Sequence, residues 1–227
     1  MTEAPAEGLR ARHKHRTRMA LRDAALRRFI RDGFEATTVE DIAADVDVSP
    51  RTFFRYFPTK DAVVVTPYLA LFDSWEEVVR SAPAGTALID ALRKASHLVT
   101  EAYERDPEFW DLHHEAITTD PTIGLRMLQT QAQLQQRATR ALGDLLALDP
   151  RDDIRPHVLA AASMAGVGAA VARWYATGRE ADRRALVDAA YEDVARAAEL
   201  LHRPLPTIEG ADRPGPVEPT EVGRVPG

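Results

Sequence analysis

Apolar side chains recur every three to four residues along most of this chain, a spacing that places them on one face of an α-helix. Leu21, Ala25 and Phe29 show this spacing near the N-terminus, and a second stripe begins at Tyr68. No stretch alternates apolar and polar residues as a strand does, and no internal repeat is present. The pattern therefore predicts an all-α protein.

Residues that favour turns and helix ends divide the pattern into about nine helices. Gly33 ends the first helix, Ser49 and Pro50 begin the third, and Pro58 ends it. The expected helices cover residues 12–31, 38 to the turn at 47, 50–57, 60–81, 86–105, 108–118, 122–147, 152–177 and 181–202. Residues 1–11 mix Ala, Glu, Pro and Gly, and residues 204–227 are rich in Pro and Gly, so both segments are expected to be disordered.

Composition limits the class of protein. The 227 residues are 45% apolar and include no cysteine, which excludes disulfides and thiolate zinc sites. The basic N-terminus lacks the apolar run of a signal peptide, so a cytoplasmic protein is expected. Residues 156–172 form the longest stretch without Asp, Glu, Lys or Arg. This stretch is shorter than the ~20 residues of a membrane span and is expected to be a buried helix.

The distribution of charge points to nucleic acid, although the net charge is −6. Residues 9–31 contain nine Arg or Lys and one acid, whereas residues 61–227 contain 17 basic and 26 acidic residues. A basic end joined to an acidic body is typical of a DNA-binding domain followed by a ligand-binding or dimerisation domain. The alternative is that the basic helix is only a solvated face.

Residues 37–60 have the layout of a helix-turn-helix, in which two short helices are joined by a tight polar turn. The second helix of such a motif enters the major groove of DNA. Phe53 and Phe57 are four residues apart and are expected to face the core, with Arg51 and Arg55 on the opposite face. Arg51 is the best candidate for a bidentate contact to guanine. Arg55 is expected to read a base or to hold a phosphate.

This block resembles the DNA-binding domain of TetR-family transcriptional regulators. The matching residues are Ala24, Ala25, Phe29, Gly33, Thr37, Thr38, Val39, Asp41, Ile42, Ala43, Val48, Ser49, Phe53, Tyr56, Phe57 and Lys60. The rest of the chain resembles the ligand-binding domain of actinobacterial regulators that include mycofactocin-system and acyl-CoA-type members. The resemblance implies a three-helix DNA-binding domain at residues 12–62 and a helical ligand-binding and dimerisation domain at residues 63–203.

The resemblance also implies which residues face DNA. The set is Thr38, Ser49, Pro50, Arg51, Thr52, Phe54, Arg55, Tyr56 and Lys60. Thr38 and Lys60 stand at helix N-termini, which attract phosphate, and together with Tyr56 they are expected to hold the DNA backbone. Two positions depart from the family. Asp47 occupies a turn position where Gly is usual, and Phe54 replaces a frequent Tyr, so it can touch a thymine methyl but cannot bond a phosphate.

Arg10, Arg12, Lys14 and Arg16 form a basic arm at the start of the chain. In some DNA-binding proteins such an arm enters the adjacent minor groove. Non-specific attraction to phosphates is the alternative, and the sequence leaves both open. Deletion of residues 1–16 is expected to weaken DNA binding and to lower its salt dependence.

In the C-terminal domain, the resemblance implies a cavity for a small-molecule effector. The candidate residues are Phe72, Trp75, Tyr103, Phe109, Trp110, His113, His114, Arg126 and Gln129. An acyl-CoA-like, lipid or drug-like effector would favour a conformer with wrongly spaced reading helices and so release the DNA. A repressor released from its operator by an effector is expected. The alternative is a ligand-independent DNA-binding or architectural protein.

A symmetric homodimer on a palindromic operator is expected, because one such domain reads only a few base pairs. The last two helices carry small residues that allow helices to approach closely. The expected interface comprises Ala165, Gly166, Gly168, Ala169, Trp174 and Tyr175. The alternative is that these residues pack within one subunit.

Two other classes of site are disfavoured. Asp111, His113, His114 and Glu115 include metal-binding residue types, but neighbours on a helix point ~100° apart and no HExxH spacing is present. His97 and His113 could still meet in space. The chain has no Gly-rich phosphate loop, no Gly-x-Ser-x-Gly elbow and no cysteine nucleophile. We therefore expect no enzymatic activity, no cofactor and no metal.

Overall fold

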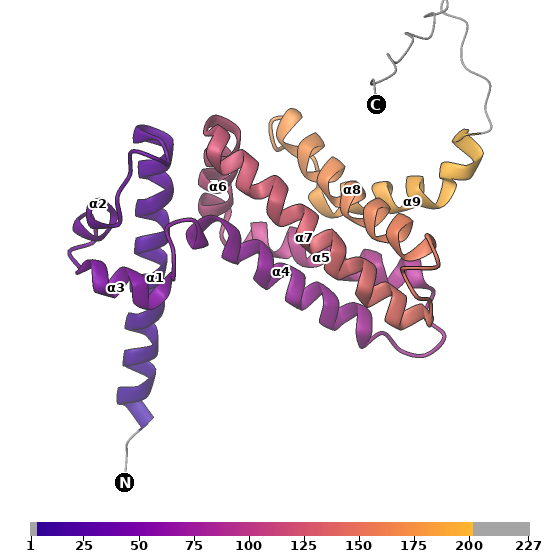
Figure 1. Ribbon diagram of the computed structural model, residues 1–227, viewed down its shortest axis with the longest axis horizontal. Coiled ribbons are helices and arrows are strands. Elements are labelled where there is room, and N and C mark those ends of the chain that lie inside the picture. The colour runs from indigo at the N-terminus through magenta and orange to yellow at the C-terminus, as the bar shows by residue number, and fades with distance from the viewer. Residues whose placement is uncertain (1–3, 202–227) are drawn as a thin grey trace, which may run out of the picture. The chain divides into compact units, whose positions relative to one another are not determined.

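The structure, a computed structural model, describes residues 4–201, with side chains described for residues 11–196 (Figure 1). Within this range the chain forms nine α-helices and no strand. They are α1 (Ala4–Asp32), α2 (Val39–Ala44), α3 (Pro50–Tyr56), α4 (Ala62–Arg80), α5 (Leu88–Arg105), α6 (Pro107–Thr119), α7 (Pro121–Leu146), α8 (Arg155–Ala176) and α9 (Arg183–Leu201). The all-α prediction is confirmed. The tail predicted at residues 204–227 lies outside the described residues.

The start of α1 corrects the predicted boundaries. Residues 4–11 were expected to be disordered, but they continue α1 toward the N-terminus. Pro5 falls in the first turn, where its missing N–H costs no helical hydrogen bond. Ala, Glu, Leu and Arg make up most of the remaining residues of this segment and favour helix. The basic arm is therefore part of a helix from Ala4 onward.

The N-terminal domain is built around one cluster of buried apolar side chains. Leu21 and Phe29 of α1, Ile42 of α2 and Phe53 of α3 are almost fully buried in it. Their positions follow the helical spacing in the sequence, because residues three or four apart share a face. Burial of such side chains stabilises the fold by roughly 1.5–3 kcal/mol each. This cluster fixes which face of α3 points away from the protein.

Local hydrogen bonds define the helix-turn-helix. Thr38 and Asp41 form a reciprocal capping box at the start of α2, with Asp41 N donating to Thr38 Oγ1 at 3.1 Å. Ser49 caps α3 by accepting from Thr52 N at 3.3 Å. The turn between them is left-handed at Asp47, with φ 53°. Asp tolerates this conformation better than most residues, so the turn forms without the usual Gly.

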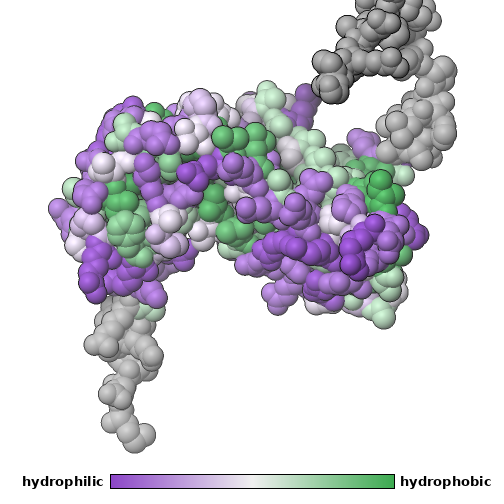
Figure 2. Space-filling model, viewed as in Figure 1, coloured by the Kyte–Doolittle hydropathy of each residue, from purple (hydrophilic) through white to green (hydrophobic). Residues whose placement is uncertain are grey.

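The C-terminal domain is a helical bundle in which α4 packs on α5 and α7, and α7 packs on α8. A second apolar cluster includes Phe72, Val79, Leu92 and Leu134. Hydrophilic side chains cover most of the face shown in Figure 2, and hydrophobic ones gather in patches between them. The bundle is therefore held by apolar packing between several helices, as the stripes in the sequence predict.

Within the described chain, α8 alone is long and apolar enough, by length and composition, to cross a membrane. Core helices of proteins that never enter a membrane meet the same criteria, so this is weak evidence. One face of α8 is buried in the bundle, including Ala160, Ser163 and Trp174. The opposite face, including Ala165 and Ala169, is exposed. The expectation of a buried helix is thus correct for one face only.

Candidate functional site

The reading helix α3 has a buried side and an exposed side. Phe53 is 0% exposed and Phe57, just after the helix, is 3% exposed, as the sequence predicts. Arg51, Phe54 and Arg55 are exposed, and the Phe54 ring keeps 51% of its surface. An exposed phenyl ring beside two guanidinium groups presents one apolar contact and several hydrogen-bond donors to whatever lies against this face.

The two exposed arginines differ in their surroundings. Arg55 lies over the Tyr56 ring at 5.1 Å, with Nη2 3.5 Å from the Tyr56 hydroxyl. Arg51 has no hydrogen bond or ion pair to any described side chain. A guanidinium without a protein partner is free to form a bidentate contact to a base edge. The geometry therefore leaves Arg51 available for direct reading of a base.

Lys60 requires a correction. We expected this residue to bind a DNA phosphate, but Nζ donates to the carbonyl oxygens of Phe34 and Thr37 at 2.5 and 2.8 Å. Nζ also lies 4.2 Å from the centre of the Phe34 ring. These contacts satisfy most of the donors of the ammonium group and draw it toward the protein. Lys60 thus ties the start of α4 to the loop after α1.

Among the other predicted DNA-facing residues, hydroxyl groups take part in caps. Thr38 Oγ1 bonds Asp41 Oδ2 at 2.5 Å, and Thr52 Oγ1 lies 3.0 Å from Ser49 Oγ. Pro50 occupies the first turn of α3. Thr38 and Ser49 are exposed, so their hydroxyls remain accessible from outside. A hydroxyl has one donor and two acceptor sites, so capping does not exhaust it.

Several basic residues of α1 serve the protein itself. Arg28 pairs with Asp45 at 2.6 Å, and its hydrogen bond lowers the pKa of that carboxyl. Arg31 pairs with Asp32, and Arg27 with Glu108. Charge patterning alone therefore overstated the basic surface of this helix. The remaining exposed basic side chains lie at its N-terminal end and comprise Arg12, Lys14, Arg16 and Arg18.

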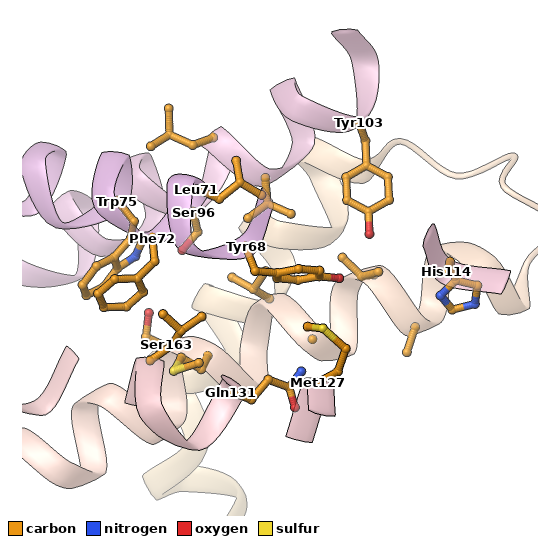
Figure 3. A pocket seen from close by; sticks show the side chains of 18 of the residues that line it. Tyr68, Leu71, Phe72, Trp75, Ser96, Tyr103, His114, Met127, Gln131 and Ser163 are labelled. Carbon is orange, nitrogen blue, oxygen red and sulfur yellow. The ribbon is translucent and has the colours of Figure 1, made fainter. Parts of the chain in front are cut away.

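A cavity of about 330 Å³ lies within the helical bundle. Its wall includes four of the predicted ligand residues, Phe72, Trp75, Tyr103 and His114. Figure 3 shows Phe72 and Trp75 side by side at one end, with Tyr103 and His114 toward the other. This volume falls within the range of small-molecule sites.

Five predicted ligand residues lie elsewhere. Phe109 and Trp110 are buried in the first apolar cluster, because α6 turns them toward α1 and α5. His113 is buried beside them and hydrogen-bonds the Val64 carbonyl. Arg126 pairs with Asp61 at 3.1 Å, and Gln129 is exposed outside the cavity. The spacing of residues along the chain could not predict where these side chains point, because this depends on which helices pack together.

The cavity also contains residues that the sequence reading missed. They include Tyr68, Ser96, Met127, Gln131 and Ser163. Tyr68 occupies the centre of the view in Figure 3. A polar residue within an apolar stripe, such as Ser96 beside Ala95, was the available signal in the sequence. Single serines in helices are too common to single out by pattern.

One helix, α6, contacts both the cavity and the N-terminal domain. His114, Ile117 and Thr118 of α6 line the cavity. At the N-terminal end of the helix, the N-cap Asp106 pairs with Arg22 at 2.8 Å, and Glu108 pairs with Arg27. A change in the position of α6 would therefore alter both the cavity wall and the contacts with the N-terminal domain.

The end of α6 forms a second link. Asp120 accepts from the backbone N of Phe34 at 2.7 Å and from Thr122 N at 2.8 Å, so it joins the loop after α1 to the start of α7. His113 Nε2 donates to the Val64 carbonyl at 2.8 Å. Burial lowers the pKa of His113 to about 4, so the ring is neutral near pH 7.

The predicted dimer residues divide into two groups. Ala165, Gly168 and Ala169 are exposed on α8. Gly166 is buried and faces α9, with Ala190 Cβ 3.7 Å from the position of a Cβ at residue 166. Trp174 is also buried, and its ring contacts Tyr103. These two residues pack within the subunit, which corrects their assignment to the interface.

Tyr175 is likewise directed into its own subunit. Its ring stacks on His114 with centroids 3.6 Å apart, and its hydroxyl donates to the Trp110 carbonyl at 3.3 Å. It is half-buried. The exposed small residues of α8 are therefore the part of the predicted interface that remains open to a partner.

The rival metal site is not assembled in the described part of the chain. No group of three or more His, Cys, Asp or Glu residues is arranged there to hold a metal ion. Asp111 pairs with Arg179, His97 pairs with Asp188, and His113 and His114 have the separate partners described above. Neighbouring helical positions point in different directions, as the sequence indicates.

These features define a helix-turn-helix DNA-binding protein whose companion domain is a helical bundle with a cavity. Residues 21–65 match the sequence profile of bacterial regulatory proteins of the tetR family. The chain is 35% identical over 176 residues to the HTH-type transcriptional regulator TcmR of Streptomyces glaucescens, covering 74% of this chain and 77% of that protein. The chain belongs to the TetR family of transcriptional regulators.

Solved structures share the fold. The fatty acid degradation regulator FadR of Bacillus halodurans matches with a TM-score of 0.50 at 15% identity, over 78% of this chain and 93% of that chain. GusR of Salmonella enterica matches with a TM-score of 0.50 at 18% identity, over 79% and 93%. At such identities the likeness concerns the fold alone.

Proposed function

We propose that this protein is a cytoplasmic repressor that binds a palindromic operator as a homodimer and leaves it when a small molecule fills the bundle cavity. The observation that carries this proposal is the double role of α6. Its side chains line the cavity and also hold α1 through Asp106 and Glu108. A ligand that moves α6 therefore acts on the domain that carries the reading helix.

In the proposed complex, α3 lies in the major groove with its exposed face toward the bases. Arg51 donates to O6 and N7 of a guanine, a contact worth about 1–3 kcal/mol of discrimination. Phe54 contacts a thymine methyl, and Arg55 reads a neighbouring base or holds a phosphate. Thr38, Ser49, Pro50, Thr52 and Tyr56 lie against the backbone.

The N-terminal part of α1 contributes contacts to phosphates. A helix is about 10 Å across, which exceeds the ~6 Å width of the minor groove. A helical arm therefore lies along the backbone rather than inside that groove. Lys14 and Arg18 are four residues apart and share one face. Arg18 lies over the Phe57 ring at 5.6 Å, which places this face next to the end of α3.

Two copies are needed because one reading helix contacts only a few base pairs. Half-sites about 34 Å apart place both helices on the same side of the duplex. Ala165, Gly168 and Ala169 are exposed on α8, and Gly168 also lines the cavity, so the proposed dimer face is centred on Ala165 and Ala169. An effector that favours a wrongly spaced conformer weakens DNA binding by its affinity ratio for the two states, about 1–3 kcal/mol.

The test begins with genome-wide footprinting of the purified protein, which identifies the operator. Fluorescence anisotropy on that operator then measures release by compounds that raise the melting temperature in a thermal-shift screen. A compound that both stabilises the protein and releases the operator supports the proposal. Stabilising compounds that leave the complex intact would favour a ligand-independent DNA-binding protein instead.

A further inference from the structure

The cavity wall carries no formal charge. Its 21 residues include no Asp, Glu, Lys or Arg. Aromatic and aliphatic side chains make up most of the wall, and its polar groups are hydroxyls, one amide, one indole N–H and the imidazole of His114. An ionised group inside such a wall loses its hydration and finds no opposite charge, which is strongly unfavourable.

Two guanidinium groups, those of Arg137 and Arg183, pack on the Phe72 and Tyr103 rings of the wall. Arg137 lies 4.7 Å from the Phe72 ring centre and is paired with Asp73 and Glu76 at 2.8 and 3.0 Å. Arg183 lies over the Trp174 ring at 4.1 Å and the Tyr103 ring at 5.2 Å. Neither belongs to the residues that line the cavity. Arg137 is neutralised by its two carboxylates, and Arg183, whose buried Nη1 has no hydrogen-bond partner, is separated from the cavity by the Tyr103 ring, so neither is placed to pair directly with a bound molecule.

The imidazole in the wall is also neutral. His114 stacks on the Tyr175 ring, and partial burial lowers its pKa, an effect that Asp111 opposes. A neutral imidazole offers one donor and one acceptor, so it suits a ligand hydroxyl or carbonyl rather than a carboxylate. The only titratable side chains in the wall are thus His114 and the tyrosines, which are uncharged near pH 7.

Polar groups gather at the end of the cavity near Phe72 and Trp75, where Figure 3 shows Ser96 and Ser163. The Tyr191 hydroxyl lies 2.7 Å from Ser96 Oγ and 2.5 Å from Ser163 Oγ, and is itself buried. Each serine hydroxyl keeps a lone pair beyond these bonds. A ligand oxygen that reaches this end can join an existing hydrogen-bond chain without leaving a buried polar group unpaired.

We infer that the cavity selects an uncharged, largely apolar and aromatic small molecule with a hydroxyl or carbonyl oxygen at the Ser96 and Ser163 end. The inference rests on the proposed effector function. It removes acyl-CoA thioesters and free fatty acids from the expected ligands, because their phosphates or carboxylate would meet no cation in the wall. Four aromatic side chains, those of Tyr68, Phe72, Trp75 and Tyr103, supply flat surfaces for ring contacts.

Two fluorescent probes that share one aromatic skeleton and differ in charge test whether the cavity prefers uncharged molecules. N-phenyl-1-naphthylamine is uncharged, and 1-anilinonaphthalene-8-sulfonate differs from it by one sulfonate. Titration of the full-length protein should show the uncharged probe binding about ten-fold more tightly or better, since the sulfonate must be desolvated without a partner. Equal binding, tighter binding of the sulfonate, or binding of neither probe would overturn the inference.

A positive charge placed in the wall should weaken this preference. Gln131 lines the cavity and is exposed at its edge, so Gln131→Lys adds an ammonium group without disturbing the core. We expect the preference for the uncharged probe to fall by about ten-fold or more in this variant. Gln129→Lys is the matched control, because Gln129 is exposed on the same helix outside the cavity. An equal shift in both variants would contradict the assignment.

The oxygen site has its own comparison. 2-Naphthol should displace the uncharged probe more effectively than 2-methylnaphthalene, by about five-fold for one hydrogen bond. In Ser163→Ala this advantage should shrink, whereas 2-methylnaphthalene should bind as before. If 2-naphthol kept its full advantage over 2-methylnaphthalene in Ser163→Ala, the ligand oxygen would not bind at Ser163. Operator release is measured separately, so selective binding without release refutes the effector function and leaves the ligand chemistry standing.

Discussion

The guanidinium of Arg22 in α1 lies 2.8 Å from the carboxylate of Asp106, the residue that caps α6. Arg22 is only 8% exposed, and its guanidinium carbon sits 3.7 Å from the centre of the Phe109 ring. Asp23 provides a second carboxylate at 2.7 Å. A residue of the basic stretch 9–31 therefore joins the two domains.

Loss of the Asp106 charge should weaken this joint. In Asp106→Asn the amide oxygen can still cap α6, but Arg22 keeps only one carboxylate. A hydrogen bond to a charged group contributes about 1.5–3 kcal/mol. Because the Asp106 side chain is 40% exposed, solvent screening reduces this, and the free energy of unfolding should fall by about 1–2 kcal/mol. Urea unfolding measures it.

Glu108→Gln is the matched control for this substitution. The pair of Glu108 with Arg27 is exposed, so its loss should cost less than about 0.5 kcal/mol. A cost for Asp106→Asn as small as that of Glu108→Gln would show that the partly buried pair of Arg22 and Asp106 adds no stability.

Arg51 should carry direct recognition of the operator. Arg51→Ala is expected to weaken operator binding by about 1–3 kcal/mol and to relax the base preference at one position of each half-site. Stability should not change, because the side chain is exposed without a partner. Anisotropy titrations with single-base operator variants measure both effects. Arg140→Ala removes the same charge from an exposed site on α7 and should bind as the wild type does.

The two faces of the N-terminal helix should differ in their contribution. Each phosphate contact adds about 0.9 to the slope of log K against log salt. The double variant Lys14→Ala, Arg18→Ala loses two phosphate contacts and should therefore reduce this slope by nearly twice that amount. Arg12→Ala combined with Arg16→Ala removes equal charge from another face of the helix and should reduce it much less. A slope lowered equally by both pairs would indicate diffuse attraction.

The sequence predicted the elements that depend on local spacing. The four-residue interval between Phe53 and Phe57 predicted which face of α3 is buried. Thr38 and Ser49 predicted the N-caps of α2 and α3. These features need no knowledge of distant contacts. For this reason the helices and caps of the DNA-binding half could be predicted from the sequence.

Features that depend on packing between distant segments were less predictable. Arg22 is one of the nine basic residues of the stretch 9–31, and its pairing with Asp106 could not be predicted because the two residues are remote in the sequence. Trp110 was assigned to the cavity, yet it stacks on Tyr103 in the core with centroids 4.8 Å apart. An aromatic residue on an amphipathic helix can face a core or a cavity equally well. Only the packing of α5 against α6 decides between them.

His113 should make the stability of the protein sensitive to pH. Its pKa is lowered by burial from 6.5 to about 4, so the unfolded chain binds a proton between these values that the folded chain excludes. Stability is therefore present above pH 6.5 and is lost as the pH falls. From pH 7 to pH 5 the free energy of unfolding should decrease by about 2 kcal/mol through this residue.

The variant that tests this is His113→Gln, whose amide can still donate to the Val64 carbonyl but does not titrate. Urea unfolding at pH 7 and pH 5 should show a smaller loss in the variant than in the wild type. His13→Gln, at an exposed position of α1, is the control and should keep the wild-type dependence. The same loss in all three proteins would mean that other groups are responsible.

The exposed face of α8 should hold the dimer together. Ala169→Glu places a carboxylate in the middle of the proposed interface, where it would be buried against its own copy across the two-fold axis. The variant should sediment as a monomer at micromolar concentration and bind the full operator much more weakly, while its helical circular dichroism is unchanged because Ala169 is exposed in the subunit. Ala70→Glu, at an exposed position of α4, should remain dimeric. A dimeric Ala169→Glu variant would show that the dimer interface does not lie on this face of α8. A monomeric wild type would contradict the proposed homodimer itself.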